Sequence, residues 1–170
     1  LVGILTSIDA IESKITSDFS RLGANTFSLM SKTSRGRQGG KTQKTYESID
    51  YYQAIAFKND YHFPATVAVS SQVSFNATVK HEGEKTNPNV AVIGCDESYL
   101  KTTGYDLESG RSFSKNELLQ GSNVAILGKD IVEKVFKGSE EVIGKSIYIG
   151  AAKFTVIGVL ESKGSSIGFS

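Results

Sequence analysis

The chain has 170 residues, of which 39% are hydrophobic and 22% are charged, as in an ordinary folded protein. This length is sufficient to bury a hydrophobic core, in one large domain or in two small lobes. The formal net charge of +1 argues against nucleic-acid binding as the main task, and no apolar run approaches the roughly 20 residues that a membrane-spanning helix needs.

The first predicted element is an amphipathic helix from Ile4 to Leu22. Gly23 is expected to end it, because glycine readily adopts the left-handed conformation of a helix C-terminus. Two interpretations stay open: a helix packed on its own sheet, or a stalk that continues out of a membrane-spanning helix. No signal peptide is visible, and Leu1 is interpreted as the edge of an excised fragment. The apolar residues that recur at intervals of three and four are Ile4, Ile8, Ile11, Ile15, Phe19 and Leu22.

A strand is predicted over Thr26 to Ser31, and a basic loop follows over residues 32–44, with five cations, three glycines and no acid. Part of the loop, GRQGGKT, is similar to a phosphate-binding loop, but that pattern requires glycine at the position of Arg35. We therefore interpret the segment as a solvated loop. Contact with anionic lipid or with a partner is the alternative.

The middle of the chain predicts a helix and a long antiparallel hairpin. The helix is expected over Tyr46 to Phe57, with Ile49, Tyr52 and Ala56 on its buried side. Alternating apolar residues over Val67 to Val79 predict a half-exposed strand, which a turn joins to a second strand over Thr86 to Gly94. Antiparallel strands with helices on one face predict an α+β architecture.

Shorter elements follow, so a boundary between two lobes is expected near Asp96. Ser114 and Glu117 have the spacing of a capping box that opens a helix. The other predicted elements are a helix over Glu97 to Thr103 that Gly104 ends, a loop over 105–113, a strand over Asn123 to Leu127, a helix over Lys129 to Phe136, and a hairpin over Lys145 to Glu161.

Short motifs occur along the chain in an order that resembles one known family, and each alone is a weak signal. They are LGAN (22–25), VIG (92–94), Tyr99, GRSF (110–113), VAILG (124–128), Phe136, IGKSI (143–147) and FTVIGV (154–159). In this order they resemble the periplasmic core domain of MacB-type ABC transporter permeases, whose relatives include FtsX-like permeases. The resemblance extends along the whole chain.

The resemblance implies two lobes. Residues 1–95 would form a porter-like lobe with the long helix and the hairpin, and residues 96–162 a sabre-like lobe of short helices and strands. The family continues beyond this point with a segment that returns to the first lobe, so the porter-like lobe is expected to lack that segment. Residues 163–170 are expected to form a flexible tail.

Several residues are expected to have structural roles. Phe113, Phe136 and Phe154 are predicted core anchors of the second lobe. Arg111 is expected to tie loop carbonyls together, since a guanidinium offers several donors. The glycines of the motifs, among them Gly110 and Gly158, are expected at turns or at close backbone approaches.

No catalytic, cofactor-binding or metal-binding residue is assigned. Cys95 is alone in the sequence and is interpreted as a small buried hydrophobic residue. His62 and His81 fall in predicted loops, where a solvated side chain is expected. Neither has carboxylates at the spacing of a metal site.

By resemblance, the chain is expected to be the periplasmic domain of a bacterial inner-membrane permease, without enzymatic activity or cofactor of its own. It would transmit ATP-driven motion to the export of drugs, peptides or lipoproteins. The implied partners are the permease's own transmembrane helices, an ABC ATPase, a second permease copy and, in tripartite members, a periplasmic adaptor and an outer-membrane channel. The alternative is an FtsX-like regulatory module that contacts a peptide or a cell-wall hydrolase.

Overall fold

The computed structural model describes residues 26–31 and 47–162. The helix predicted over Ile4 to Leu22, the basic loop 32–44 and the tail 163–170 lie outside the described residues. The helices are α2 (Tyr51–Asp60), α3 (Tyr99–Thr103), α4 (Lys115–Gln120) and α5 (Lys129–Phe136). The strands are β1 (Ser70–Ala77), β2 (Val79–His81), β3 (Glu84–Lys85), β4 (Val90–Cys95), β5 (Leu107–Gly110), β6 (Val124–Leu127), β7 (Ser146–Ile149) and β8 (Ala152–Leu160).

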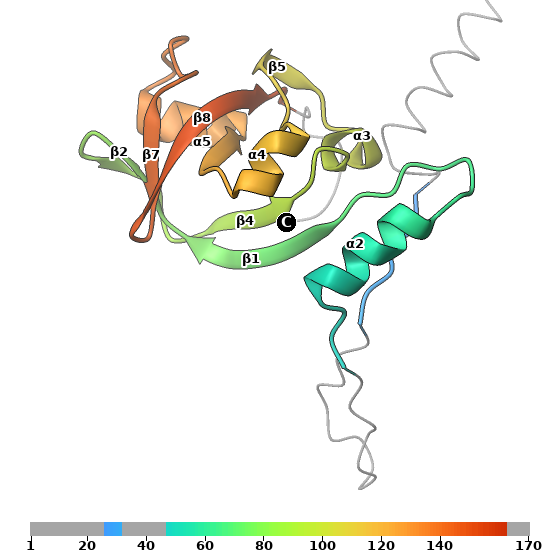
Figure 1. Ribbon diagram of the computed structural model, residues 1–170. Coiled ribbons are helices and arrows are strands. Elements are labelled where there is room, and N and C mark those ends of the chain that lie inside the picture. The colour runs from blue at the N-terminus through green and yellow to red at the C-terminus, as the bar shows by residue number, and fades with distance from the viewer. Residues whose placement is uncertain (1–25, 32–46, 163–170) are drawn as a thin grey trace, which may run out of the picture.

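The strands form two sheets (Figure 1). β1 and β4 make an antiparallel two-stranded sheet. The second sheet has six strands in the order β3-β2-β7-β8-β5, and β6 pairs with β8 in parallel. Because β2 pairs with β7, strands from both sides of Asp96 in the sequence share this second sheet.

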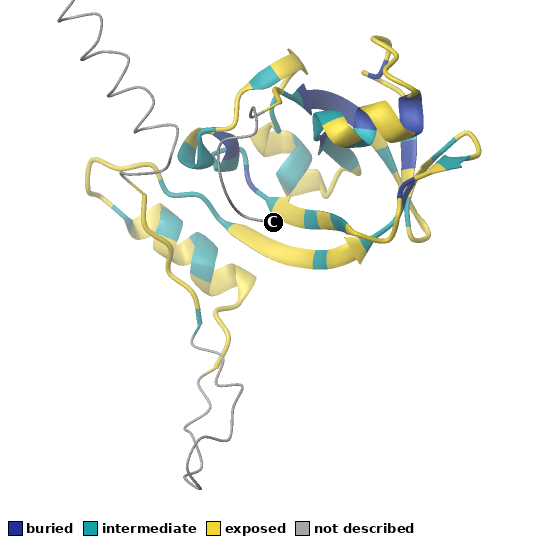
Figure 2. Cartoon of the chain, turned by 180° about the vertical axis from the view of Figure 1, so that it is seen from behind, coloured by how far each residue is buried: buried dark blue, intermediate teal, exposed yellow. Residues whose placement is uncertain are grey.

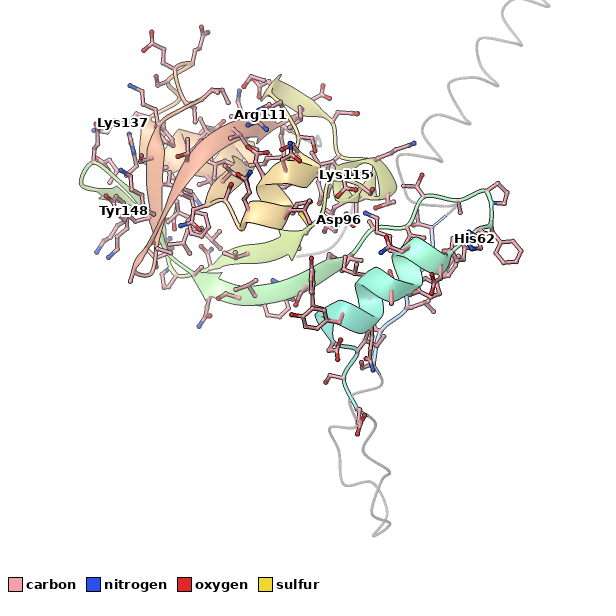
Figure 3. All side chains as sticks on the ribbon, in the orientation of Figure 1. His62, Asp96, Arg111, Lys115, Lys137 and Tyr148 are labelled. Carbon is pink, nitrogen blue, oxygen red and sulfur yellow. The ribbon has the colours of Figure 1, made fainter. Side chains whose placement is uncertain are left out.

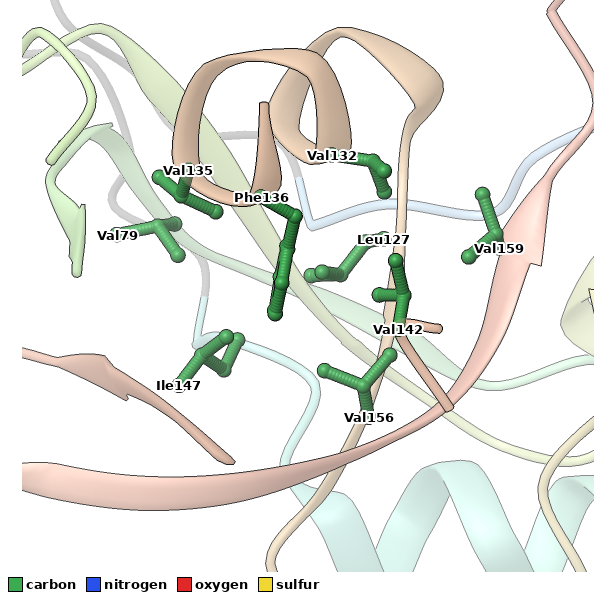
Figure 4. Packing of buried hydrophobic residues seen from close by; sticks show 9 residues of the cluster. All are labelled: Val79, Leu127, Val132, Val135, Phe136, Val142, Ile147, Val156 and Val159. Carbon is green, nitrogen blue, oxygen red and sulfur yellow. The ribbon is translucent and has the colours of Figure 1, made fainter. Parts of the chain in front are cut away.

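The hydrophobic core lies between the six-stranded sheet and α5 (Figure 4). α5 contributes Val132, Val135 and Phe136, which share one face of the helix at the spacing i, i+3 and i+4. The sheet contributes Ile147 and Val156, both with no exposed surface. Burying each such aliphatic side chain stabilises the fold by about 1.5–3 kcal/mol.

The distribution of burial is uneven along the chain. Buried residues are concentrated in the six-stranded sheet and α5, whereas α2 and β1 are mostly exposed (Figure 2). Within the described residues, no helix is both long and apolar enough to span a membrane.

The second half of the chain matches the predicted elements closely. The predicted helix 129–136 is α5, the predicted strand is β6, and the predicted hairpin is β7 with β8. Gly104 ends α3 in the left-handed conformation, and Ser114 with Glu117 forms the expected capping box of α4. Of the three predicted core anchors, Phe136 is buried, Phe154 is half-buried against the core, and Phe113 is half-buried.

Two predictions near the start of the described chain are wrong. Residues 26–31 are not a strand, and Phe27, Leu29 and Met30 are exposed. Alternation alone cannot make a strand, because a strand also needs a hydrogen-bonded partner. The helix predicted from Tyr46 begins instead at Tyr51, because Asp50 caps it: the carboxylate accepts from the N–H of Gln53.

The long strand predicted over Val67 to Val79 is divided into two strands in different sheets. β1 pairs with β4 as expected of the hairpin, but after Ala77 the chain crosses to the other sheet, where Val79 begins β2. A side-chain period of two continues through such a crossing, so the sequence pattern does not reveal it. In β1 the apolar Val73 and Phe75 are exposed.

The loop predicted over 105–113 contains a strand, β5, which pairs with the end of β8. Two glycines allow these backbones to approach. A Cβ added to Gly110, whose φ is +81°, would lie 2.2 Å from the carbonyl oxygen of Ile157, and one added to Gly158 would lie 2.9 Å from that of Arg111. The expected glycine role is therefore confirmed here.

Candidate functional site: the Asp96 junction

α2 contacts the rest of the protein through one narrow face. None of its residues is buried, and its half-buried residues Ala54, Ile55 and Lys58 lie on the same side of the helix. The sequence predicts that a different side of this helix would be buried, but Tyr52 and Ile49 on that side are exposed. Lys58 is on the half-buried side and contacts the segment between β4 and α3.

Asp96, which is labelled in Figure 3, lies just after β4. Its carboxylate binds three separate segments. Its Oδ2 accepts from Nζ of Lys58 at 2.6 Å and from the backbone N–H of Val69 at 2.8 Å. Its Oδ1 accepts from the N–H of Ser98 at 3.0 Å. Asp96 is only 7% exposed, and these partners satisfy a carboxylate that would otherwise be costly to bury.

The backbone of Asp96 strengthens the same connections. Its N–H donates to the carbonyl of Val69 at 3.0 Å, and its carbonyl accepts from the N–H of Tyr99 at 3.2 Å. Asp96 therefore fixes the entry to β1, the exit from β4 and the start of α3 at one point. We call this set of contacts, together with Lys58 and Glu97, the Asp96 junction.

Lys58 also binds Oε1 of Glu97 at 3.0 Å, so one ammonium group serves two carboxylates. Partial burial is the largest single influence on Lys58 and lowers its pKa, but the hydrogen bonds to Asp96 and Glu97, together with the negative charges of these carboxylates, leave the pKa raised. Burial is the largest single influence on Glu97 and raises its pKa, but the hydrogen bond from Lys58, a backbone hydrogen bond and the positive charges of Lys58 and Lys115 together leave the pKa lowered. Lys58 and Glu97 are therefore charged at neutral pH, and the junction holds α2 in place by charge-assisted hydrogen bonds.

The junction does not have the composition of a catalytic site. Its neighbour Cys95 is half-buried, and burial, with a further contribution from Asp96, raises the pKa of the thiol to about 11. A thiol with that pKa stays protonated and unreactive at neutral pH. Within the described ranges, no group of three or more His, Cys, Asp or Glu side chains could hold a metal ion.

A second polar cluster lies at Arg111, which has a different partner from the one expected. The guanidinium donates to both oxygens of Glu117, at 2.9 and 2.6 Å, and, among the described residues, to one carbonyl, that of Ser112 at 3.1 Å. Glu117 also accepts from the N–H and Oγ of Ser114, which completes the cap of α4. The hydrogen bond from Arg111, with those from Ser114, lowers the pKa of Glu117 to about 2.

The two histidines differ from each other. His62 is exposed outside regular structure, as expected. His81 is not a solvated loop residue: it lies in β2, its Nδ1 is 2.7 Å from the carbonyl oxygen of Ser146, and its ring packs on Phe136 at 4.1 Å. The β2–β3 hairpin and its pairing with β7 bring the side chain inward.

The sequence predicts a boundary near Asp96, but it does not indicate that Asp96 and Lys58 bind each other. They are 38 positions apart, and no motif connects them. The one available signal was a charged residue next to the end of an apolar strand, which is a weak indication of a buried ion pair.

A family model described as the MacB-like periplasmic core domain matches residues 1–170. The resemblance indicated by the sequence motifs is thereby confirmed. Among curated relatives, the protein named macrolide export ATP-binding/permease protein MacB from Neisseria gonorrhoeae is 28% identical over 177 residues, which cover 100% of this chain and 26% of that protein. The protein of the same name from Hahella chejuensis is 23% identical over 168 residues, which cover 99% of this chain and 24% of that protein. The chain thus spans about a quarter of the length of these relatives.

A solved structure supports the fold. The periplasmic region of MacB from Actinobacillus actinomycetemcomitans matches with a TM-score of 0.54 and 21% sequence identity, covering 64% of this chain and 50% of that one. The mixed helix-and-sheet architecture predicted from the sequence agrees with this similarity. At this level of identity, the comparison concerns the fold alone.

Proposed function

Because the chain belongs to the MacB-like periplasmic core domain family, we propose that it transmits ATP-driven conformational change from the membrane to the export of a substrate. The observation that carries this proposal is the match of the family model over the whole chain. A periplasmic domain of a permease is not itself a catalytic unit. Its contribution would be mechanical.

We propose that the domain has two lobes with a sequence boundary near Asp96, porter-like over 1–95 and sabre-like over 96–162. The pairing of β1 with β4 in a sheet of their own supports this division, as does the absence of α2 and β1 residues from the larger hydrophobic core. The β2–β3 hairpin would be the part of the first lobe that reaches across to the second, since Val79 is buried in that core. The Asp96 junction would lie where these two lobes meet and would pass motion between them.

ATP hydrolysis is proposed to occur on a separate domain or subunit, with the permease acting as a dimer through its transmembrane helices. A periplasmic adaptor and an outer-membrane channel would join it in a tripartite assembly. The relatives are named for macrolide export, so a macrolide is the first substrate to test, with peptides and lipoproteins as further candidates.

The proposal is tested by inserting a Gly-Ser pair near Ser13, in the helix predicted over Ile4 to Leu22, within the full-length permease. Glycine costs about 1 kcal/mol in a helix and makes it more flexible, so the insertion should uncouple its two ends. ATPase activity should survive while macrolide resistance falls sharply. Export at the wild-type level, with normal expression, would contradict a mechanical role.

The alternative is an FtsX-like regulatory module that contacts a peptide or a cell-wall hydrolase. The observation that favours it is the exposure of aromatic side chains on and beside α2, among them Tyr51, Tyr52 and Phe63. Exposed aromatic groups of this kind are common at protein interfaces. Pull-down with candidate adaptors and hydrolases separates the two functions, because only the regulatory module should retain a hydrolase.

A further inference from the structure

A row of basic residues crosses the solvent-facing side of the six-stranded sheet. The strand register places Lys85 of β3 opposite Lys80 of β2, Lys80 opposite Tyr148 of β7, and Tyr148 opposite Lys153 of β8. All four residues are exposed. Directly paired residues on neighbouring strands project to the same face, so they form one continuous row, which we call the lysine row. Tyr148 is labelled in Figure 3.

Within the described residues, the lysines of the row are not paired with acidic side chains. None of its three lysines forms an ion pair there, although other lysines, such as Lys129 with Glu108, do. The strand residues next to the row on the same face, Ser146 and Thr155, are uncharged. Glu82 lies in the adjoining turn, where its carboxylate is 3.8 Å from Nε2 of His81.

This arrangement is electrostatically unfavourable in the isolated domain. Like charges directly opposite each other in a sheet, as Lys80 and Lys85 are, destabilise the pairing. The opposite face of the same strands shows the contrast, because there Val79 and Ile147 are buried in the core. An anionic partner would relieve the repulsion between the lysines and complement the charge of the row.

We propose that the lysine row binds an extended acidic segment of a partner protein. Neighbouring strands lie about 4.8 Å apart, so the row from β3 to β8 extends over about 14 Å. An extended chain rises about 3.4 Å per residue and directs every second side chain to one side, so three acidic residues at alternate positions also extend over about 14 Å. The flexible lysine stems accommodate the remaining mismatch, and Tyr148 presents a hydroxyl donor and an aromatic edge between them.

A membrane surface fits the lysine row less well. Sites for anionic lipid usually have about four to eight basic residues, more than the lysine row contains. Tyr148 is the one aromatic residue in the row and is only 44% exposed, so the row lacks a large apolar side chain to insert among lipid chains. Lipid binding is therefore treated as a competing outcome of the test.

The test measures fluorescence anisotropy of a labelled peptide of alternating Glu and Thr residues, titrated with the full 170-residue chain. The same peptide with Gln in place of Glu is the control ligand. The row variant is Lys80→Ala with Lys85→Ala and Lys153→Ala. The matched variant is Lys101→Ala with Lys115→Ala and Lys134→Ala, which removes the same charge from exposed positions on three helices.

The Glu peptide should bind and the Gln peptide should not. The row variant should weaken binding by about tenfold, since each exposed ion pair contributes modestly, and the matched variant by less than about twofold. Binding should also fall steeply toward about 1 M salt, where the Debye length is about 3 Å. Circular dichroism checks that both variants remain folded.

Three outcomes would overturn the proposal. One is the absence of binding to the Glu peptide, and another is an equal loss in the row and matched variants, which would indicate net charge alone. The third is row-dependent binding to phosphatidylglycerol vesicles without binding to the Glu peptide, which would assign the row to a lipid surface. The proposal does not depend on the export function, because the test involves neither ATP nor substrate.

Discussion

Asp96 holds three segments together, because its buried carboxylate accepts from a side chain and from two backbone N–H groups. In Asp96→Ala these donors lose their acceptor in a partly buried setting. We expect a loss of about 2–3 kcal/mol in the free energy of unfolding, measured by denaturant titration. The exposed Asp60 is the control, and Asp60→Ala should change stability by less than about 0.5 kcal/mol. Equal effects of the two substitutions would show that the junction does not stabilise the fold.

The depressed pKa of Glu117 makes the stability of the protein depend on pH. Its pKa is depressed from 4.5 in the unfolded chain to about 2 in the folded protein, so its contribution to stability is complete above pH 4.5 and is lost as the pH falls through about 2. The difference in melting temperature between the wild type and Glu117→Gln should therefore be largest above pH 4.5 and shrink toward pH 2. A difference that stays constant over this range would show that the ion pair with Arg111 does not form in solution.

Among the secondary-structure elements, the pairing of β5 with β8 depends on the glycine at position 110, Gly110. In Gly110→Ala the new Cβ meets the Ile157 carbonyl, and φ of +81° disfavours any side chain, so we expect a cost of about 2 kcal/mol or more. Gly128 is the matched control, because a Cβ there has no atom within 4 Å and its φ is −70°. Thermal unfolding of the two variants compares them directly. Similar melting temperatures would contradict the close approach of these strands.

The elements also show what the sequence could and could not predict. α5, β6 and the β7–β8 hairpin were predictable because each is specified by local periodicity, with a nearby glycine or turn to end it. β5 and the division between β1 and β2 were not, because both depend on partners far away in the sequence. The same reason applies to the polar contacts. The capping box at Ser114 is local, so the sequence predicts it, whereas the contact of Lys58 with Asp96 joins distant positions, so the sequence does not predict it.

At the scale of the whole molecule, the central claim is that the domain transmits motion through the Asp96 junction. α2 and the β1–β4 sheet, which belong to the proposed first lobe, meet at the junction, and α3 leads from it into the proposed second lobe. Lys58 is the best residue to change, because its ammonium connects α2 to both acids while Asp96 keeps its backbone partners. Lys58→Met retains much of the apolar stem and removes the charge.

The most direct test is the amount of substrate exported per ATP hydrolysed by the full-length transporter carrying Lys58→Met, with Lys101→Met on the exposed face of α3 as control. We expect ATPase activity within about twofold of the wild type in both variants, while export per ATP falls about tenfold in Lys58→Met alone, as expected when about 1.4 kcal/mol of coupling is lost. Unchanged export per ATP in a folded, normally expressed Lys58→Met transporter would contradict the account.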